Sequence, residues 1–322
     1  MNEAIQQVGV VVPHYGDPAP TRDLVASLIG QALSIVVVDD ASPEPLAPIA
    51  GASVVRREVN GGFGAAVNTG MARLPTELAL ILNSDLEIGP TFVADLLAGA
   101  APWQPVVASP QVTTLDGDPE WVGRHFPTIG HQVIEWLTPL ARFRHLPRLH
   151  EGVGHDTRAV GDAVVPVDWV VGAAVLVPVA AFRAVGGFDE RYFMNAEEVD
   201  LQRRLRGLGI PSVVLGTVSV VHRGGGSSDP ARSRQWLVAS RLQYARTWGG
   251  LRRLQMALVG ASAVNLCANV SRRALRRPVR PVDVLREELR LIQGRGAGHA
   301  AARPPSPAGV PTDTEQDLPC ER

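Results

Sequence analysis

The sequence of 322 residues contains no lysine and only two cysteines, and its formal net charge is close to zero, at -1. Every strongly basic side chain is therefore an arginine. Cys267 and Cys320 are too few to build a disulfide framework or a cysteine zinc site, which excludes the small disulfide-stapled folds and fits a reducing compartment. The near-neutral net charge by itself indicates no polyanionic partner.

Targeting segments are also missing from the sequence. The beginning of the chain lacks the basic region and the small-residue cleavage site that characterise a signal peptide. No segment approaches the run of roughly 20 purely apolar residues that typically forms a transmembrane helix. We therefore expect a cytoplasmic protein, with any membrane contact peripheral and on the inner face of the cell membrane.

Short apolar runs rich in β-branched residues alternate with helical patterns in the first part of the chain. Hydrophobic residues make up 45% of the sequence, which is enough for a substantial core. The runs at residues 8–12, 34–38, 53–55 and 78–82 predict buried parallel strands. Strands that alternate with helices predict an α/β fold with a doubly wound, mostly parallel sheet. Such sheets bind ligands at the carboxyl ends of their strands, so polar residues that follow a strand are candidate site residues.

The pattern weakens between residues 102 and 167, which we interpret as a long excursion between strands. Residues 231–293 then carry thirteen arginines and only three acidic residues, whereas the rest of the chain is acidic. We expect an α/β domain over residues 1–228, a basic helical module over residues 229–293, and a disordered, proline-rich tail over residues 294–322.

Three polar or glycine-rich segments follow predicted strands. Asp39 and Asp40 end the second strand, where a carboxylate can accept hydrogen bonds from a nucleotide base or ribose, or can cap the next helix. The glycine-rich residues 60–70 either bind an anion at the start of a helix or form an ordinary turn. Asp85 ends a short segment that either offers oxygen ligands to a divalent metal or is a plain polar turn.

Two further groups lie in the second half of the α/β domain. Glu197 and Glu198 begin a predicted helix at residues 197–208, where acids complement the helix dipole but where a carboxylate can also act as a general base. A neighbouring acid raises the pKa of a carboxyl group, which favours that role. His222 ends a predicted strand at residues 213–221, a position that suits a structural histidine as well as a metal or phosphate ligand.

The order of these five groups resembles the family 2 glycosyltransferases with the GT-A fold, in particular their rhamnosyltransferase-like branch. The resemblance covers about residues 8–228 and implies a Rossmann-like, mostly parallel central sheet flanked by helices, with the basic module as a C-terminal helical extension. It also implies a set of residues that bind the nucleotide sugar: Pro13, Tyr15, Asp39, Asp40, Gly62, Asn68, Asn83, Ser84, Trp169 and Gly172.

The same resemblance implies roles for the charged residues. Asp85 and His222 would hold Mg2+ or Mn2+ on the diphosphate, and Glu198, beside Glu197, would be the catalytic base. The family usually has Glu-Asp where this chain has Glu197 and Glu198, so the base is one methylene longer and its reach toward the acceptor differs. Asn83 replaces the first aspartate of the family's Asp-x-Asp motif, as is common in this branch. The Gln-x-x-Arg-Trp motif of processive synthases is missing, so we expect single additions.

We therefore expect an inverting, metal-dependent glycosyltransferase. The resemblance favours transfer of rhamnose from dTDP-rhamnose to a hydroxyl of a cell-envelope glycan or a lipid-linked acceptor. A UDP- or GDP-sugar donor, or a catalytically weak nucleotide-sugar-binding scaffold, are the alternatives. A nucleotidyltransferase would carry a glycine-rich, basic segment directly after the first strand, which this chain lacks. Nucleic acid is not an expected partner, because few aromatic residues (Trp236, Tyr244 and Trp248) interleave with the arginines.

The basic module contains an apolar stretch that has two interpretations. Residues 254–270 are mostly small and apolar, and arginine pairs flank them on both sides. This pattern suits a helix that lies on an anionic membrane surface near a lipid-linked acceptor. It suits equally a helix that packs against the catalytic domain and leaves its arginines in solvent. The sequence therefore leaves peripheral membrane contact through residues 229–293 open.

Overall fold

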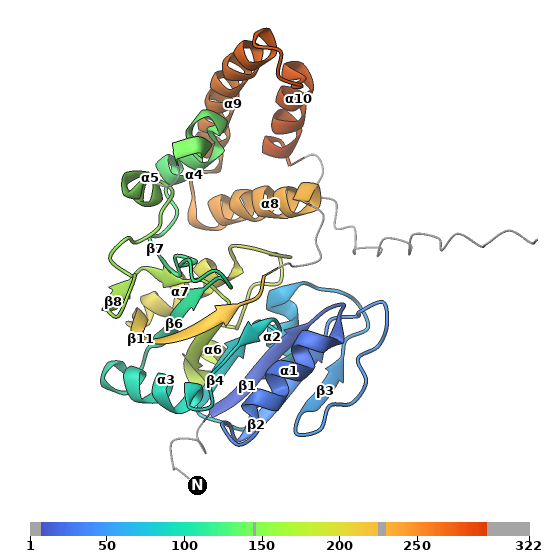
Figure 1. Cartoon of the computed structure of the whole chain (residues 1–322), viewed down its shortest axis with the longest axis vertical. Helices are drawn as coiled ribbons and strands as arrows, with labels where there is room; N and C mark the ends of the chain where they lie inside the picture. Colours follow the sequence, from blue (N-terminus) through green and yellow to red (C-terminus); the bar gives the residue numbers. More distant parts are fainter. Residues whose placement is uncertain (1–7, 144–145, 225–229, 295–322) are drawn as a thin grey trace, which may run out of the picture.

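The computed structural model of the chain describes residues 8–143, 146–224 and 230–294. It consists of an α/β domain and a group of helices that projects from one side of this domain (Figure 1). Gly225 and Gly226, which follow the motif at His222, lie outside the described residues, as does the tail beyond residue 294 that we expect to be disordered.

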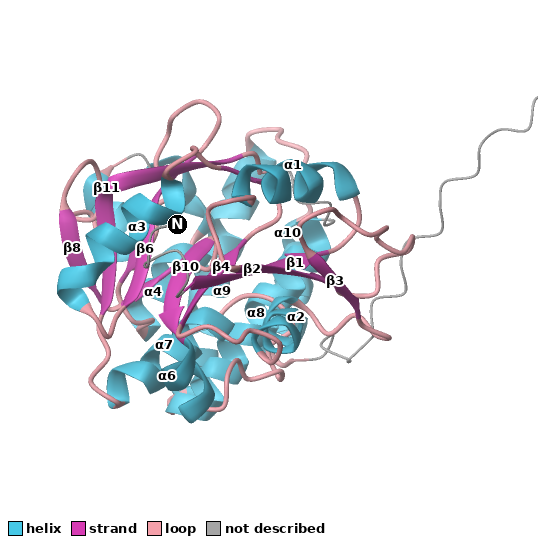
Figure 2. Ribbon diagram, turned by 90° about the horizontal axis from the view of Figure 1, so that it is seen from below, coloured by secondary structure: helices cyan, strands magenta, loops and turns pink. Residues whose placement is uncertain are grey.

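A curved sheet forms the centre of the α/β domain (Figure 2). Within the described residues, nine strands join it in the spatial order β3-β2-β1-β4-β10-β6-β11-β5, with β8 beside β11. These strands are β1 (Val8–His14), β2 (Ser34–Asp39), β3 (Ser53–Arg56), β4 (Leu78–Leu82), β5 (Leu86–Glu87), β6 (Val107–Thr113), β8 (Val164–Val167), β10 (Ala174–Pro178) and β11 (Ser212–His222). A separate pair consists of β7 (Gly123–Arg124) and β9 (Trp169–Val170).

The expected α/β architecture with a mostly parallel sheet is confirmed. β1 lies between β2 and β4 and is parallel to both, and β6 is parallel to β11. However, β10 is antiparallel to β4 and β6, which the alternation of strands and helices did not predict. Parallel neighbours need a crossover of about a dozen residues or more. Only residues 171–173 connect β9 to β10, so the chain enters the sheet there without a crossover helix.

Helices cover both faces of the sheet. The helices of this domain are α1 (Pro18–Leu28), α2 (Phe63–Met71), α3 (Phe92–Ala100), α6 (Val179–Ala184) and α7 (Glu197–Gly207). α1 and α3 lie on one face, where Gln31 donates a hydrogen bond to the carbonyl of Gly89 and accepts one from the amide of Val93. α2, α6 and α7 lie on the other face. Apolar side chains of the strands and of both helix layers form one continuous core.

A second group of helices has its own small core. Its helices are α4 (Ile129–Trp136), α5 (Pro147–Gly152), α8 (Pro230–Trp248), α9 (Leu251–Ala274) and α10 (Pro281–Ile292), with the short 3-10 helix η3 (Thr138–Phe143) after α4. A second 3-10 helix, η2 (Ala101–Trp103), continues α3 in the α/β domain. Trp136 of α4 packs with Leu242, Leu254 and Leu258 of α8 and α9. α4 belongs to the excursion at residues 102–167, so this core joins the middle of the chain to the basic module.

One helix corrects the expectation that no segment approaches a transmembrane helix. α9 has 24 residues, and its most apolar 18-residue window has a mean hydropathy of 1.3 and is 33% buried. By length and composition it is long and apolar enough to cross a membrane. The polar residues that interrupt its apolar run made the sequence pattern look weaker. Core helices of soluble proteins meet the same criterion, so this property alone assigns no location.

The loop before α2 depends on a glycine at its closest approach to the rest of the domain. Gly62 precedes α2 with a φ of 85°, and a Cβ at this position would lie 1.8 Å from the carbonyl oxygen of Phe193. Phe193 lies just before α7. The contact therefore holds the start of α2 against the start of α7, and both of these helix starts carry predicted site residues.

Gly62→Ala is expected to destabilise the fold both through its backbone conformation, with a ψ of 179°, and through the clash with Phe193. Gly30 has the same φ of 85° but nothing within 4 Å of an added Cβ, so Gly30→Ala is the comparison without a clash. We expect Gly30→Ala to lower the free energy of unfolding by about 1–2 kcal/mol, and Gly62→Ala to lower it by about 2 kcal/mol more, because strain and clash together force backbone shifts. Urea unfolding measures both values, and equal losses would contradict the tight contact.

Candidate active site

Strand pairing at one edge of the sheet places Asp85 beside His222. β5 begins directly after Asp85 and pairs with the end of β11, where His222 lies opposite Leu86. The main-chain amide of Arg223 also donates to the carbonyl of Asp85 at 3.0 Å. As a result, Nε2 of His222 lies 3.0 Å from a carboxylate oxygen of Asp85. Both residues were predicted as metal ligands, and the fold brings them into direct contact.

A third residue, Glu120, completes this group and was missed in the sequence. Both carboxylate oxygens of Glu120 lie 3.0 Å from Nδ1 of His222. The chain turns back after β6, and the amide of Glu120 donates to the carbonyl of Val112. The Asp-Gly pair at residues 116–117 is a typical hairpin sequence and was the local signal for this return. We call Asp85, Glu120 and His222 the metal-site group.

A protonated imidazole lies between the two carboxylates of the metal-site group, so its positive charge offsets part of their negative charge. Hydrogen bonds with Asp85 and Glu120 raise the pKa of His222 to about 10, so the imidazole is protonated at neutral pH. Burial alone would raise the pKa of Asp85, but the hydrogen bond and the charge of His222 hold it below its usual value. The three side chains are between 18% and 27% exposed, so a ligand can reach them from solvent.

Asp85 and His222 offer an oxygen and a nitrogen donor that suit Mg2+ or Mn2+. Both ions prefer carboxylate oxygens, and transition metals also accept an imidazole nitrogen. A bound cation would replace the proton of His222 as the positive charge that Asp85 and Glu120 share. Asp85 and Nε2 of His222 therefore fit a divalent metal, as predicted, and Glu120 would hold the imidazole in place through its other ring nitrogen, Nδ1.

A second group of potential metal ligands lies in the excursion between β6 and β8. His125, Glu151 and Asp156 each offer a ligand atom, and these atoms lie within 4.8 Å of one another. Nε2 of His125 is 3.0 Å from a carboxylate oxygen of Glu151, whose other oxygen accepts hydrogen bonds from Thr157. Asp85 and His222 lie at strand ends, where ligands bind in this class of fold, so we take the metal-site group as the first candidate and the group at His125 as the second.

The start of α7 places two glutamates beside the loop that follows β9. Burial and the neighbouring charge of Glu198 raise the pKa of Glu197 well above its usual value. Burial also raises the pKa of Glu198, against the lowering effects of the Gly172 amide and of the Arg124 charge. Each of the two carboxylates has one buried oxygen without a hydrogen-bond partner among the described residues. A carboxylate with a raised pKa is the stronger base, so Glu198 has the property that a general base needs.

The loop that contains Gly172 joins these glutamates to the metal-site group. Gly172 contacts Glu198 so closely that an added Cβ would lie 2.9 Å from the Glu198 Cγ. The next residue, Ala173, accepts a hydrogen bond of 2.8 Å from the amide of Asn83, two residues before Asp85. The predicted base, the predicted pocket segment and the strand-end segment are therefore neighbours.

Trp169 supports the charge that acts on Glu198. In the β7–β9 pair, Trp169 lies opposite Arg124. The indole of Trp169 also donates to the carbonyl of His125 at 2.9 Å, which fixes the strand that carries Arg124. Arg124 was missed in the sequence because it lies in the excursion, where no periodic pattern indicates which way a side chain points.

The carboxylate of Asp39 is bonded to other groups of the protein. It is fully buried, accepts hydrogen bonds from the amides of Ser42 and Leu46, and pairs with Arg56 at 2.5 Å. Burial alone would raise the pKa of Asp39, but these bonds, led by those from Ser42, hold it below its usual value. Asp39 therefore shapes the loop after β2, and direct contact between its carboxylate and a nucleotide stays a prediction.

Asp40 holds the glycine-rich loop in the same way. Its carboxylate accepts hydrogen bonds from the amides of Gly61 and Gly62, at 3.1 Å and 2.8 Å, and lies 2.8 Å from the Nε of Arg57. Burial raises the pKa of Asp40 in spite of these partners. The aspartate pair therefore positions two loops at the edge of the sheet where ligands bind in this class of fold.

The remaining predicted residues divide into one structural clamp and several residues without a defined contact. Asn68 donates to the carbonyl of Phe188 and accepts from the amide of Phe188, both at 2.9 Å, so it ties α2 to the segment before α7. Tyr15 is 39% exposed just beyond Pro13, and Ser84 is partly buried. Contact of these residues with a nucleotide sugar stays a prediction.

Mn2+ binding should require the metal-site group and should release a proton. His222 is protonated at neutral pH because its pKa is raised to about 10, whereas a metal-bound imidazole is neutral. We expect calorimetry in buffers of different ionisation enthalpy to detect proton release with the unchanged protein. Asp85→Asn should abolish binding, and His222→Gln should remove the proton release.

The second potential metal group provides the control for this titration. His125→Gln changes that group and leaves Asp85 and His222 in place, so it should bind Mn2+ like the unchanged protein. If His125→Gln loses Mn2+ binding and Asp85→Asn keeps it, the metal binds at the group with His125, and our assignment to Asp85 is wrong.

Comparisons with known proteins agree with the fold and with the motif order. Residues 9–160 match the model of Glycosyl transferase family 2. N-acetylglucosaminyl-diphospho-decaprenol L-rhamnosyltransferase of Mycobacterium tuberculosis is 32% identical over 189 residues, which are 53% of this chain and 59% of that protein. Pre-mycofactocin glycosyltransferase of the same organism is 29% identical over 212 residues, which are 62% of this chain and 39% of that protein.

A solved structure shows the same fold. The crystal structure of GalNAc-T7 with UDP, GalNAc and Mn2+ aligns with a TM-score of 0.52 and 13% identity, over 73% of this chain and 49% of that one. At this identity the likeness concerns the fold alone, which is GT-A. The family model, the motif order and the sheet topology agree: residues 9–160 resemble Glycosyl transferase family 2, and the α/β domain has the GT-A fold.

Proposed function

We propose that the chain is an inverting glycosyltransferase that moves a sugar from a nucleoside diphosphate to a hydroxyl group of an acceptor. The observation that carries this proposal is that one loop, residues 172–173, contacts Glu198, a carboxyl group of raised pKa, and is hydrogen-bonded to the segment that ends at Asp85 of the metal-site group. The metal-site group suits a diphosphate leaving group, and Glu198 suits a hydroxyl nucleophile. The loop with Gly172 keeps the two groups together.

In the proposed reaction, Glu198 acts on the acceptor. It takes the proton of the acceptor hydroxyl while the hydroxyl oxygen attacks the anomeric carbon on the face opposite the diphosphate. The bond between the anomeric carbon and the diphosphate oxygen breaks, and the nucleoside diphosphate leaves with the electron pair. Arg124 keeps part of Glu198 ionised, because its charge opposes the effect of burial on the pKa. Positioning of the two reactants supplies much of the acceleration.

The donor would bind across the strand ends of β1, β2 and β4. Asp85 and His222 would hold Mg2+ or Mn2+, with Glu120 orienting the imidazole, and the ion when bound would neutralise the charge that develops on the leaving diphosphate. The loops that Asp39 and Asp40 position lie at the same edge and would contact the base and ribose. The start of α2 has no acidic residue in its first turn and favours an anion nearby.

We propose dTDP-rhamnose as the donor and a lipid-linked glycan as the acceptor. The motif order supports this choice, as does the similarity to a protein named for rhamnose transfer to N-acetylglucosaminyl-diphospho-decaprenol. The matched region spans 59% of that protein, so its substrates come to this chain only as a proposal. UDP- and GDP-sugars are the alternative donors. The reaction would take place in the cytoplasm, at the inner face of the cell membrane.

Glu198→Gln should retain donor binding and lose transfer. The amide keeps the shape of the side chain but cannot take a proton, so we expect the transfer rate to fall about 100- to 10,000-fold. Calorimetry with dTDP-rhamnose, UDP-glucose and GDP-mannose measures binding, and product formation with a soluble acceptor analogue measures transfer. Glu197→Gln is the neighbouring comparison and should keep measurable transfer. Binding without transfer in the unchanged protein would instead support a nucleotide-sugar-binding scaffold.

The pH dependence of transfer should report the raised pKa of Glu198. A base must be ionised, so activity should increase with pH through a value above the usual 4.5 of a glutamate. Arg124→Met removes a charge that lowers this pKa, so the acidic limb of the kcat/KM profile should move to higher pH. Arg158→Met, in a surface pair with Asp156, is the matched control. An unchanged limb in Arg124→Met would contradict the role given to Arg124.

A further inference from the structure

α9 exposes a run of apolar side chains to solvent while it buries three polar ones beside Leu254 and Leu258. Its buried face includes the polar residues Ser262, Asn265 and Asn269, which are 0%, 0% and 4% exposed. Between Arg253 and Ser271, its exposed positions carry only apolar or small side chains: Met256, Val259, Gly260, Ala263, Val264, Cys267 and Val270. Surface helices normally point polar residues outward, whereas no part of the chain that the structure describes covers this apolar face.

Hydrogen bonds hold the polar face of α9 inward. Ser262 accepts a hydrogen bond of 2.9 Å from the indole of Trp136. Asn265 accepts from the amide of Thr138 at 2.9 Å and donates to Glu288 of α10 at 3.0 Å. Rotation of the helix to bring these groups to solvent would break all of these bonds, because α4 and α10 provide the partners. The apolar side of α9 therefore faces outward as a consequence of the fold.

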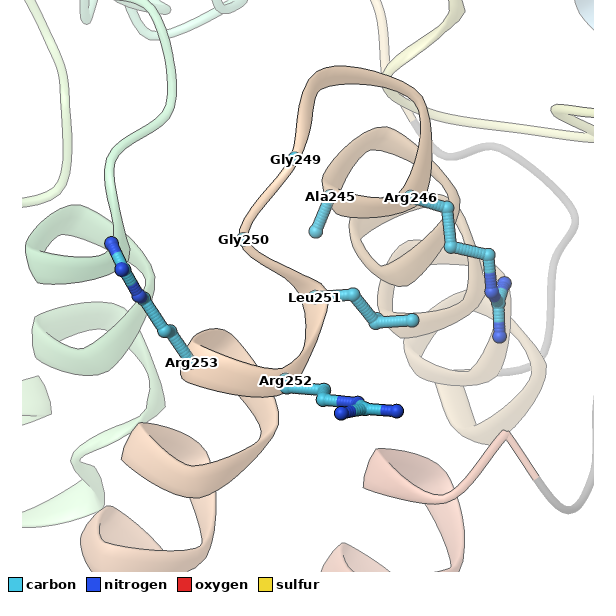
Figure 3. A pocket seen from close by; sticks show the side chains of 7 residues that line it. All are labelled: Ala245, Arg246, Gly249, Gly250, Leu251, Arg252 and Arg253. Carbon is cyan, nitrogen blue, oxygen red and sulfur yellow. The ribbon is translucent and has the colours of Figure 1, made fainter.

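Arginines lie at both ends of this apolar face. A hollow of about 560 Å3 at the turn between α8 and α9 is lined by Arg246, Arg252 and Arg253. Figure 3 shows Arg246 and Arg252 close together on one side of the turn and Arg253 pointing to the other side. Arg272 and Arg273 occupy the last turn of the helix. Residues 230–282 contain no acidic side chain, so nothing acidic on this stretch offsets these charges.

We propose that the exposed face of α9, bounded by arginines at both ends, docks on a bilayer surface that carries anionic phospholipids. The apolar side chains would enter the boundary between head groups and acyl chains, and the arginines would contact the phosphates. This inference deepens the proposed function by naming the surface that holds the enzyme near a lipid-linked acceptor. It rests on that function only for the nature of the acceptor.

The helix lies along the membrane in this arrangement and does not cross it. The apolar face from Met256 to Val270 is about 22 Å long, shorter than the hydrocarbon core of about 30 Å. Arginine pairs close it at both ends. The opposite face, on which Leu254 and Leu258 lie beside the buried polar residues, is already covered by α4, η3 and α10. A surface orientation keeps these contacts and leaves the charged ends in the head-group region.

A second copy of the chain is the other occupant to consider, and the charges disfavour it. Two copies packed through α9 would bring arginine pairs against arginine pairs, because both ends of the face are basic. This holds for parallel and for antiparallel packing. An anionic surface complements the same charges at both ends. The charge distribution therefore selects lipid over self-association.

Vesicle co-sedimentation of the full chain tests this proposal. The unchanged protein should sediment with phosphatidylcholine vesicles that contain phosphatidylglycerol, and much less with phosphatidylcholine alone. Val259→Glu combined with Val270→Glu places charges three turns apart on the exposed face, at positions 45% and 54% exposed, and should release the protein. Arg252→Gln with Arg253→Gln should weaken binding on the order of tenfold or more, as should an increase from about 0.1 M to about 1 M salt.

A matched control changes exposed apolar residues of the α/β domain instead. Ile29→Glu with Leu115→Glu alters positions that are 57% and 65% exposed and should leave vesicle binding unchanged. We call Val259→Glu with Val270→Glu the α9 variant. Equal vesicle binding by the α9 variant and the unchanged protein would overturn the proposal. It would also be overturned if the unchanged protein does not bind anionic vesicles but forms a dimer, and the α9 variant is a monomer.

Donor binding separates this test from the proposed function. The α9 variant should bind the donor like the unchanged protein, because α9 carries none of the proposed donor residues. Vesicle binding without turnover of any donor would defeat the proposed function and leave the α9 surface in place. Turnover of a donor without vesicle binding through α9 would support the proposed function and defeat the α9 surface.

Discussion

Carboxylates that the fold removes from water determine how the ligand edge of the sheet is built. A buried or half-buried carboxylate costs free energy unless a cation or several hydrogen-bond donors compensate for it. Asp39 and Asp40 meet this requirement with Arg56 and Arg57 and with main-chain amides, so they cannot be removed without releasing two loops. Asp85 instead depends on His222, whose proton is the one charge in the group that a metal ion can replace.

Close main-chain contacts keep these charged groups at fixed separations. Gly62 lets the loop before α2 touch the carbonyl of Phe193, and Gly172 lets the loop after β9 touch Glu198. Side chains at either position would push apart the elements that carry the nucleotide loops, the predicted base and the strand-end segment. The basic module is shaped by hydrogen bonds instead, because those that its helices make inward leave the apolar side of α9 exposed. The α/β domain and the module therefore serve different partners, a water-soluble donor and a lipid surface.

The sequence predicted most of the α/β domain and the ligands that follow strands. The strands at residues 8–12, 34–38 and 78–82 were found because buried parallel strands form short apolar runs. Asp85 and His222 were proposed as ligands because ligands gather at strand ends, and the fold brings the two side chains into contact, although their role as ligands stays a prediction. Glu120 and Arg124 were missed because they lie in the excursion, where tertiary contacts set the direction of each side chain. The sequence also could not show that Asp39 pairs with a side chain of the protein, because its partner Arg56 comes from the neighbouring strand. Composition showed that residues 254–270 are apolar but could not show that the polar residues among them face inward.

The position of the metal ion is the most direct test of the account. Crystals of the protein with Mn2+ and a nucleoside diphosphate would reveal the ion through its anomalous scattering. The account predicts one strong peak at bonding distance, about 2.0–2.6 Å, from a carboxylate oxygen of Asp85, with the diphosphate on the far side of the ion and the Gly172 loop and Glu198 beside it. A peak at His125 and Glu151, or a diphosphate bound without any ion near Asp85, would contradict it.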